Sequence, residues 1–259
     1  MRIVVVALLA LMAAPCALAQ SDPFVASRPG ATEGPIAVPG GYLQLETEVA
    51  SYARTRDSGF EADSYSLAAS TLRYGLGDGW DAELVVQPFL RSEVTVGGIE
   101  DSADGFGDVT LRVLKNLSGQ NGDGAAMAVI GYVSLPSATE DMGAGRVEGG
   151  GFLTGSFGLA EDWGAAWTVG AAARNMDGGD YQAEGSLALQ LNHAFSERLS
   201  GYAEVAASRL EHDTQTPATF DVGAALLIGE TTQVDAGVNF GITDSADDFQ
   251  VFAGWAHRF

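Results

Sequence analysis

The three histidines have the widest chemical range of any side chains in this sequence, because imidazole can act as a general base or a metal ligand. A Ser-His-acid hydrolase needs a histidine within hydrogen-bond reach of a hydroxyl and an orienting carboxylate. His193 follows Asn192 at a short predicted turn, His212 lies in an acidic segment, and His257 is close to the C-terminus. The sequence has no Gly-x-Ser-x-Gly and no HExxH motif. We predict that the chain is not an enzyme and has no catalytic residue.

Acidic segments are the remaining candidates for a metal site. Residues 100–104 and 244–248 are rich in Asp and Glu, but neither matches the calcium-binding loop that closes on a Glu. His212 lies between Glu211 and Asp213, an arrangement that also suits a solvated loop. We predict no metal and no cofactor, and interpret the acidic segments as solvated loop tips.

A larger set of charged side chains alternates with apolar ones. In residues 181–192, Leu187, Leu189 and Leu191 share one face of an extended segment, whereas Gln190 and Asn192 share the other. If the polar faces enclose water, many charged side chains line a lumen. These are Glu46, Glu48, Arg73, Asp81, Glu83, Arg91, Asp108, Arg112, Arg174, Glu184, Glu204, Asp221 and Asp235. An acidic lumen favours cations or neutral polar solutes; alternatively, these groups pair across the barrel and hold it shut.

Composition restricts the surroundings of these faces. The chain has 259 residues, with 13 Lys and Arg against 34 Asp and Glu, a formal net charge of -21. That charge disfavours a nucleic-acid partner. Charged residues make up 18% of the chain, below the roughly 25% usual for soluble domains. Much of the surface is therefore expected to face something other than water.

The first residues predict export. Arg2 precedes an apolar run from residue 3 to residue 14, and Ala17-Leu18-Ala19 provides a small-residue cleavage site before Gln20. We therefore predict a signal peptide over residues 1–19, which would also remove the single cysteine, Cys16. No later apolar stretch approaches the length of a spanning helix, so a membrane-resident mature chain must cross with strands.

Residues 20–40 form a separate segment before the barrel. They hold four prolines among Gly and Ser and show no helical or strand periodicity. Two placements remain open for them, a plug inside the lumen or a tail in the periplasm. The barrel itself is expected over residues 41–259.

Twelve segments of that region read as strands, an even number. They are 41–53, 64–76, 79–91, 106–117, 125–136, 150–159, 163–174, 181–194, 199–210, 219–228, 232–242 and 248–259. Short connections at 77–78, 160–162, 195–198 and 229–231 alternate with longer polar ones at 54–63, 92–105, 137–149 and 211–218. This asymmetry predicts an all-β fold, a transmembrane antiparallel β-barrel of about 12 strands in a Gram-negative outer membrane. A soluble sandwich with its apolar faces inward is the alternative.

Aromatic residues are placed where membrane interfaces are expected. Trp80 and Trp163 each follow a tight predicted turn, the position of an interfacial girdle. In the last strand, Val251, Trp255 and Phe259 share the apolar face, and the sequence ends on Phe259. We interpret Trp255 and Phe259 as a C-terminal signal for the barrel-assembly machinery.

Short motifs spread over residues 27 to 259 resemble an outer-membrane transporter family named for the meta-pathway of phenol degradation. They are Ser27-Arg28-Pro29-Gly30, Gly34-Pro35, Val38-Pro39-Gly40, Leu43-Gln44-Leu45-Glu46, Leu72-Arg73-Tyr74-Gly75-Leu76, Gly105-Phe106-Gly107-Asp108-Val109 and Asp235-Ala236-Gly237-Val238-Asn239-Phe240-Gly241-Ile242-Thr243. The resemblance implies a transmembrane β-barrel that passes small, often hydrophobic or aromatic, molecules. The acidity of this chain and its Ala- and Gly-rich strands depart from the family pattern.

We therefore expect a passive, porin-like channel for small solutes. A closed structural barrel without conductance is the alternative, and a lipid-modifying hydrolase is the third hypothesis. The expected partners are outer-membrane lipid and lipopolysaccharide, the assembly machinery and the solute.

Overall fold

The computed structural model describes residues 24–122, 124–176 and 179–259, so the expected signal peptide lies outside the described residues. Within these described residues, fourteen strands form one sheet. The strands are β1 (Leu43–Asp57), β2 (Phe60–Gly77), β3 (Trp80–Val86), β4 (Phe89–Val96), β5 (Ile99–Gly105), β6 (Val109–Ser118), β7 (Ala126–Leu135), β8 (Glu148–Ala160), β9 (Trp163–Asn175), β10 (Tyr181–Ala194), β11 (Leu199–Leu210), β12 (Ala218–Ile228), β13 (Thr232–Gly241) and β14 (Phe249–Arg258). In the described residues, no helix is long and apolar enough to cross a membrane.

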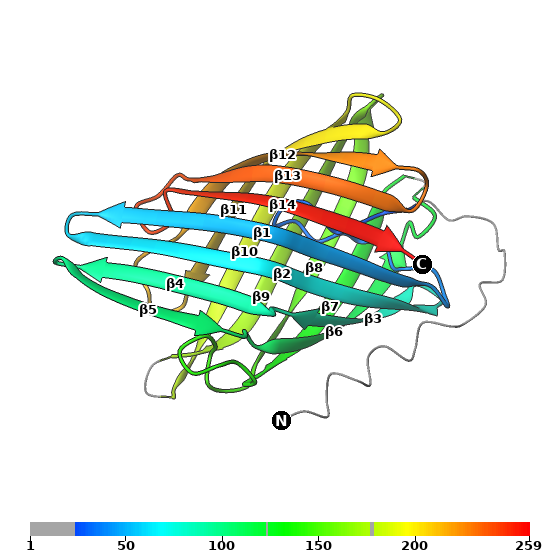
Figure 1. Ribbon diagram of the computed structural model, residues 1–259. Coiled ribbons are helices and arrows are strands. Elements are labelled where there is room, and N and C mark those ends of the chain that lie inside the picture. The colour runs from blue at the N-terminus through cyan, green and yellow to red at the C-terminus, as the bar shows by residue number, and fades with distance from the viewer. Residues whose placement is uncertain (1–23, 123, 177–178) are drawn as a thin grey trace.

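The sheet closes on itself because β1 pairs antiparallel with both β14 and β2. Twelve strands, β1 to β3 and β6 to β14, make this ring, and Figure 1 shows them as a tilted cylinder. Closure leaves no free edge within the ring. The prediction of an all-β barrel of about 12 strands is confirmed.

β4 and β5 are continuations of two ring strands. β4 pairs with the far part of β2 and β5 pairs with β4, so a four-stranded ribbon, residues 50–67 and 89–105, extends from one end of the barrel (Figure 1). The predicted long loops at 54–63 and 92–105 are therefore wrong. The chain instead turns at Ser58-Gly59 and Gly97-Gly98, where Gly59, Gly97 and Gly98 have positive φ, as tight hairpin turns require.

The alternation of faces is reversed at the base of this ribbon. On β1, Glu48 pairs with Gly254 whereas Ala50 pairs with Ala253, so the register shifts by one residue. On β2, Ala68 has a φ of 57° at the same level. Such a bulge moves every later side chain to the opposite face.

Arg91 is the residue that this reversal affects most. Residues directly opposite one another on paired strands share a face of the sheet. Arg91 of β4 lies opposite Tyr65 of β2, Tyr65 lies opposite Tyr52 of β1, and Tyr52 lies opposite Val251 of β14. Val251 faces outward because its neighbour Phe252 lies inside, against Arg28. Arg91 is therefore on the outer surface, and its predicted place in the lumen is wrong because the strand is interrupted at Gln87-Pro88, between the end of β3 and the start of β4, where the alternation changes face.

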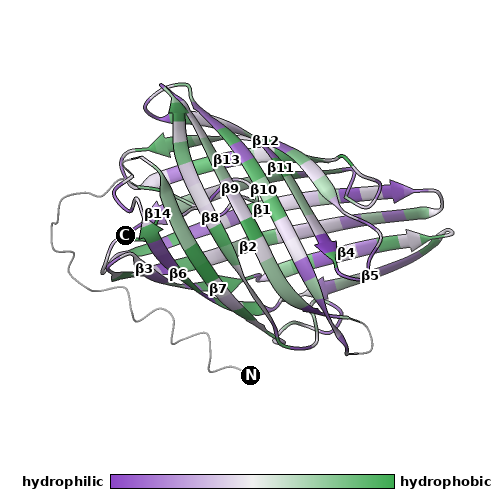
Figure 2. Ribbon diagram, turned by 180° about the vertical axis from the view of Figure 1, so that it is seen from behind, coloured by the Kyte–Doolittle hydropathy of each residue, from purple (hydrophilic) through white to green (hydrophobic). Residues whose placement is uncertain are grey.

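The barrel has polar side chains buried and apolar side chains exposed. Arg73, Asp81 and Glu204 are at most 1% exposed, whereas Leu187 and Leu189 are 45% and 53% exposed. Figure 2 shows hydrophobic and hydrophilic residues alternating along the strands. This polarity is the reverse of a water-soluble fold and is typical of a barrel surrounded by lipid.

Candidate functional site: the barrel lumen

Residues 24–40, here called the lumenal loop, lie inside the cylinder. The loop joins β1 at the end of the barrel with the short turns, where the Gly41 amide donates to the Gly75 carbonyl over 2.8 Å. Its other end returns to the same barrel end, where the guanidinium of Arg258 lies 5.3 Å from the ring of Phe24. Between these ends the loop rises so that Glu33 lies beside Thr168 and Thr154 of the barrel wall.

One side of the lumen is held together by Arg73. Its guanidinium lies 3.0 Å from Glu46, 2.7 Å from Asp81 and 3.3 Å from Glu83, and its side chain is 2% exposed. The same group donates to the Ile36 carbonyl of the lumenal loop over 2.9 Å. A buried guanidinium with its donors distributed in this way joins three strands and the loop into one unit.

Arg112 extends this network along the wall. Its guanidinium lies 2.7 Å from Glu83 and 2.7 Å from Glu33 of the lumenal loop. Loop amides add to the contacts, since Ser27 donates to Glu46 and Val38 donates to Asp81, each over 3.0 Å. We call Glu46, Arg73, Asp81, Glu83 and Arg112 the ionic wall.

Two carboxylates across the lumen bind the middle of the loop. Glu204 accepts the amides of Ala31 and Thr32 over 2.6 and 2.9 Å and the Thr32 hydroxyl over 2.5 Å. Asp235 pairs with Arg28 at 3.0 Å. The loop therefore supplies the positive charge and the amide donors that these buried carboxylates require.

The other predicted lumen residues are more scattered. Arg174 bridges Glu148 at 2.9 Å and Glu184 at 2.5 Å, nearer the opposite end of the barrel. Asp108 accepts amides of residues 137, 138 and 144 and so orders the segment after β7. Asp221 is buried as the register partner of Glu204. Glu48 is partly buried on β1, next to the bulge.

The sequence interpretation missed the lumenal partners within the loop itself. Arg28 and Glu33 are the only charged residues of the loop, and each pairs with a wall residue of opposite charge. Their position as two isolated charges in an otherwise uncharged, Pro-rich segment was the sequence signal that could have identified them as partners of the charged wall residues. Glu148, which binds Arg174, was missed because the sequence pattern placed residue 148 in a loop.

A cavity of about 240 Å³ separates the lumenal loop from strands β8 to β12. The barrel side chains and backbone that line it carry no formal charge, and we call them the neutral wall. Its members are Ser156, Ala166, Gln190, Asn192, Ser200, Gly201, Tyr202 and Ala225.

The histidines are placed apart from this cavity. The His193 ring lies between Trp163 and Phe195, at centroid distances of 4.4 and 4.8 Å, and His257 contacts the Thr232 hydroxyl over 2.8 Å. Among the described residues, no three His, Cys, Asp or Glu side chains come together in a way that could hold a metal ion.

Comparison with known sequences gives one family. The family described as "Putative MetA-pathway of phenol degradation" matches residues 26–259. Among proteins with curated descriptions, none matches this chain.

Solved structures share the fold at low sequence identity. The β domain of the Bordetella autotransporter BrkA has a TM-score of 0.56 at 14% identity, covering 85% of this chain and 100% of that one. The translocator domain of the autotransporter NalP from Neisseria meningitidis gives 0.51 at 14%, covering 85% and 89%. The NanC porin gives 0.52 at 8%, covering 82% and 98%. These likenesses show the fold, that of outer-membrane β-barrels.

Proposed function

From the premise that this chain belongs to the family described as "Putative MetA-pathway of phenol degradation", we propose that it is a passive outer-membrane channel for small solutes. The observation that carries the proposal is the closed ring of strands with a charged, hydrogen-bonded interior and an apolar exterior. A cylinder of this polarity is stable in lipid and offers water-soluble molecules a polar interior. The proposal includes export by a cleaved signal peptide into a Gram-negative outer membrane.

The lumenal loop is the proposed constriction. It makes hydrogen bonds or ion pairs with inner faces on both sides of the barrel, from Glu46 to Glu204 and Asp235. A 12-stranded barrel is wider than the eight-stranded barrels that their own side chains fill. A loop in that wider lumen restricts passage to small molecules.

Aromatic solutes are the proposed substrate class within this family. Inside the barrel, the rings of Tyr132 and Phe152 stack at a centroid distance of 5.4 Å and an interplanar angle of 17°. Phe152 also packs on the buried cluster of Ala37, Leu114 and Ile130. A flat ring surface at the lumen suits the face of a small aromatic or ring-shaped molecule.

Contacts with the envelope form the third part of the proposal. The Phe259 amide donates to the Leu43 carbonyl over 2.8 Å at the seam between the last and first strands, which suits an assembly signal at Trp255 and Phe259. Outside, charged pairs such as Arg54 with Asp63 follow the aromatic row of Tyr52 and Tyr65. A change from aromatic to charged side chains along the outer surface suits a boundary with lipopolysaccharide.

Conductance in planar bilayers tests the channel. We expect discrete steps from the purified full-length chain. A closed structural barrel is the second candidate, favoured by the many hydrogen bonds of the lumenal loop. The double variant Arg28→Ala/Glu33→Ala removes both ion pairs of the loop and separates the two. Wild-type silence with conductance in the variant means a closed barrel, and silence of both contradicts the channel.

A further inference from the structure

The lumenal loop divides the lumen into two unequal sides. Toward the ionic wall the loop is sealed, because Arg73 binds its carbonyl at Ile36 and Arg112 binds its Glu33. Asp81 accepts the amide of Val38 on the same side. These contacts hold the loop against the ionic wall.

The opposite side holds the cavity of about 240 Å³ against the neutral wall. A molecule with a handful of carbon and oxygen atoms fits this space. The wall is open there because Ala166 and Ala225 have small side chains.

The hydrogen-bonding groups of this wall are neutral. Gln190 and Asn192 carry amides, while Ser156 and Ser200 carry hydroxyls; these groups both donate and accept. A neutral hydroxylated molecule can exchange its bonds with water for bonds with them.

The charged groups that border the cavity already have partners. Arg28 pairs with Asp235 and Glu33 pairs with Arg112, while Glu204 accepts three hydrogen bonds from loop residues. An anion entering here would lose hydration and find no free cation, which is a large cost in a confined site. The donors to Glu204 are neutral, and its register partner Asp221 is buried beside it, so negative charge remains next to the passage.

We infer that solutes pass the lumenal loop along the neutral wall, and that this passage selects small neutral hydroxylated molecules over anions of the same size. The inference deepens the proposed channel function and rests on it. It assigns the exclusion of anions, which an acidic lumen predicts, to this one passage.

Swelling of liposomes that contain the full-length protein tests the inference. The probes are erythritol, sodium erythronate, which has the same carbon skeleton with a carboxylate, and choline chloride. We expect erythritol to enter at least about tenfold faster than erythronate. Equal rates for erythritol and erythronate would overturn the inference while leaving the channel function in place.

Two neighbouring substitutions locate the passage. Ala225→Phe places a ring in the cavity, whereas Ala224→Phe places the same ring on the exposed outer face of β12. We expect Ala225→Phe to slow erythritol entry about fivefold or more and Ala224→Phe to leave it unchanged. No difference between them would mean that the passage lies elsewhere.

Asn192→Asp keeps the side-chain size and adds a negative charge to the neutral wall, so it serves where a bulky variant fails to fold. We expect it to raise choline entry relative to erythritol about fivefold; an unchanged ratio overturns the inference. Circular dichroism checks that each variant forms the barrel. If no probe enters through the wild type or through Arg28→Ala/Glu33→Ala, the channel function itself fails.

Discussion

The ionic wall and the neutral wall face each other across the lumenal loop and are built from opposite kinds of side chains. On the ionic wall, Arg73 and Arg112 are long enough to reach several carboxylates and the loop at once. On the neutral wall, Ala166 and Ala225 leave a cavity. Charged side chains in this lumen therefore anchor the loop, whereas small neutral side chains leave room beside it.

The largest effect is expected on the ionic wall. Arg73→Ala would leave Glu46, Asp81 and Glu83 buried without their cation, at a cost of about 3 to 5 kcal/mol in the free energy of unfolding. Urea unfolding in lipid vesicles measures it. Ser200→Ala on the neutral wall is the matched control, with an expected change within about 0.5 kcal/mol. Equal losses at both positions would abolish the distinction between the walls.

The second effect tests which face of β10 meets lipid. Leu189→Arg puts a charge on the exposed apolar face and should cost about 2 to 4 kcal/mol if it lies near the middle of the bilayer. Gln190→Arg puts the same side chain inside, where Gln190 already contacts Glu204 at 3.1 Å, and should be much milder. The same unfolding measurement compares them, and equal costs would reverse our assignment of faces.

Anchoring of the loop by the ionic wall is the third test. Glu33→Gln removes the charge that faces Arg112 at 2.7 Å, and should weaken this contact by about 1 to 2 kcal/mol. We expect more frequent openings in single-channel records. As a control, Glu61→Gln alters an exposed pair with Arg56 on the ribbon and should leave the single-channel records unchanged. A similar response to both variants would mean that the lumenal loop does not control the current.

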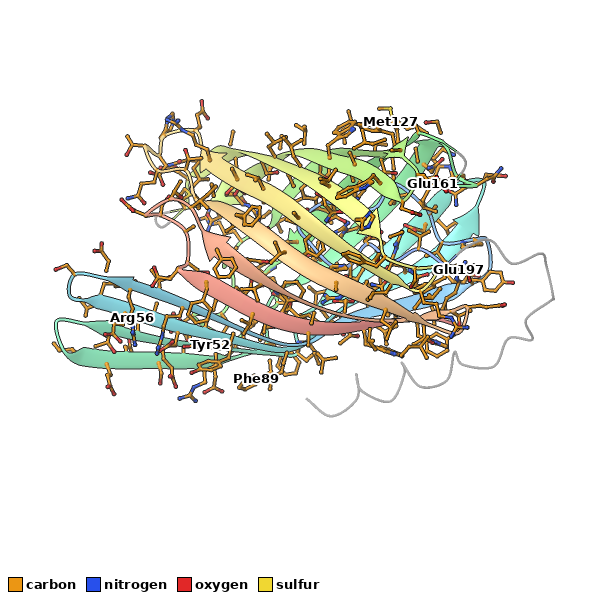
Figure 3. All side chains as sticks on the ribbon, turned by 90° about the horizontal axis from the view of Figure 1, so that it is seen from above. Tyr52, Arg56, Phe89, Met127, Glu161 and Glu197 are labelled. Carbon is orange, nitrogen blue, oxygen red and sulfur yellow. The ribbon has the colours of Figure 1, made fainter. Side chains whose placement is uncertain are left out.

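The smallest effect concerns the ribbon outside the lumen. Arg91 is 41% exposed and lies 2.7 Å from Glu93, so Arg91→Ala should change the free energy of unfolding by less than about 1 kcal/mol. Figure 3 labels Tyr52, Arg56 and Phe89 along this ribbon. If Arg91→Ala lowered the free energy of unfolding as much as Arg73→Ala, Arg91 would have to belong to a buried network, which would contradict its outward position.

Strand positions were predictable where alternation is strict. The predicted segments 181–194 and 199–210 coincide with β10 and β11, because successive side chains of a strand point to opposite faces. Residues 54–63 and 92–105 were predicted as loops because their acidic and Gly-rich composition resembles loops. Outside the lipid both faces of a strand meet water, so composition no longer separates strand from loop.

The sequence predicted which side chains of the candidate site lie on the polar faces of the strands, but not which of these side chains contact one another. Alternation placed Glu46, Arg73 and Glu204 on polar faces, but it could not tell that Arg73 binds Glu46 whereas Glu204 binds the loop. For Arg91 it predicted the opposite face, because it treated residues 79–91 as one strand, whereas the strand is interrupted at Gln87-Pro88, a position that the proline marks in the sequence.

Local alternation predicts which side chains of a regular strand share a face and that the two faces differ in polarity, since both follow from the geometry of extended chain. The position of residues 24–40, the carboxylates that each arginine pairs with and the side of the loop on which space remains follow from the folded barrel alone. Those outcomes depend on ring closure, which brings residues far apart in sequence, such as Arg28 and Asp235, to within 3.0 Å.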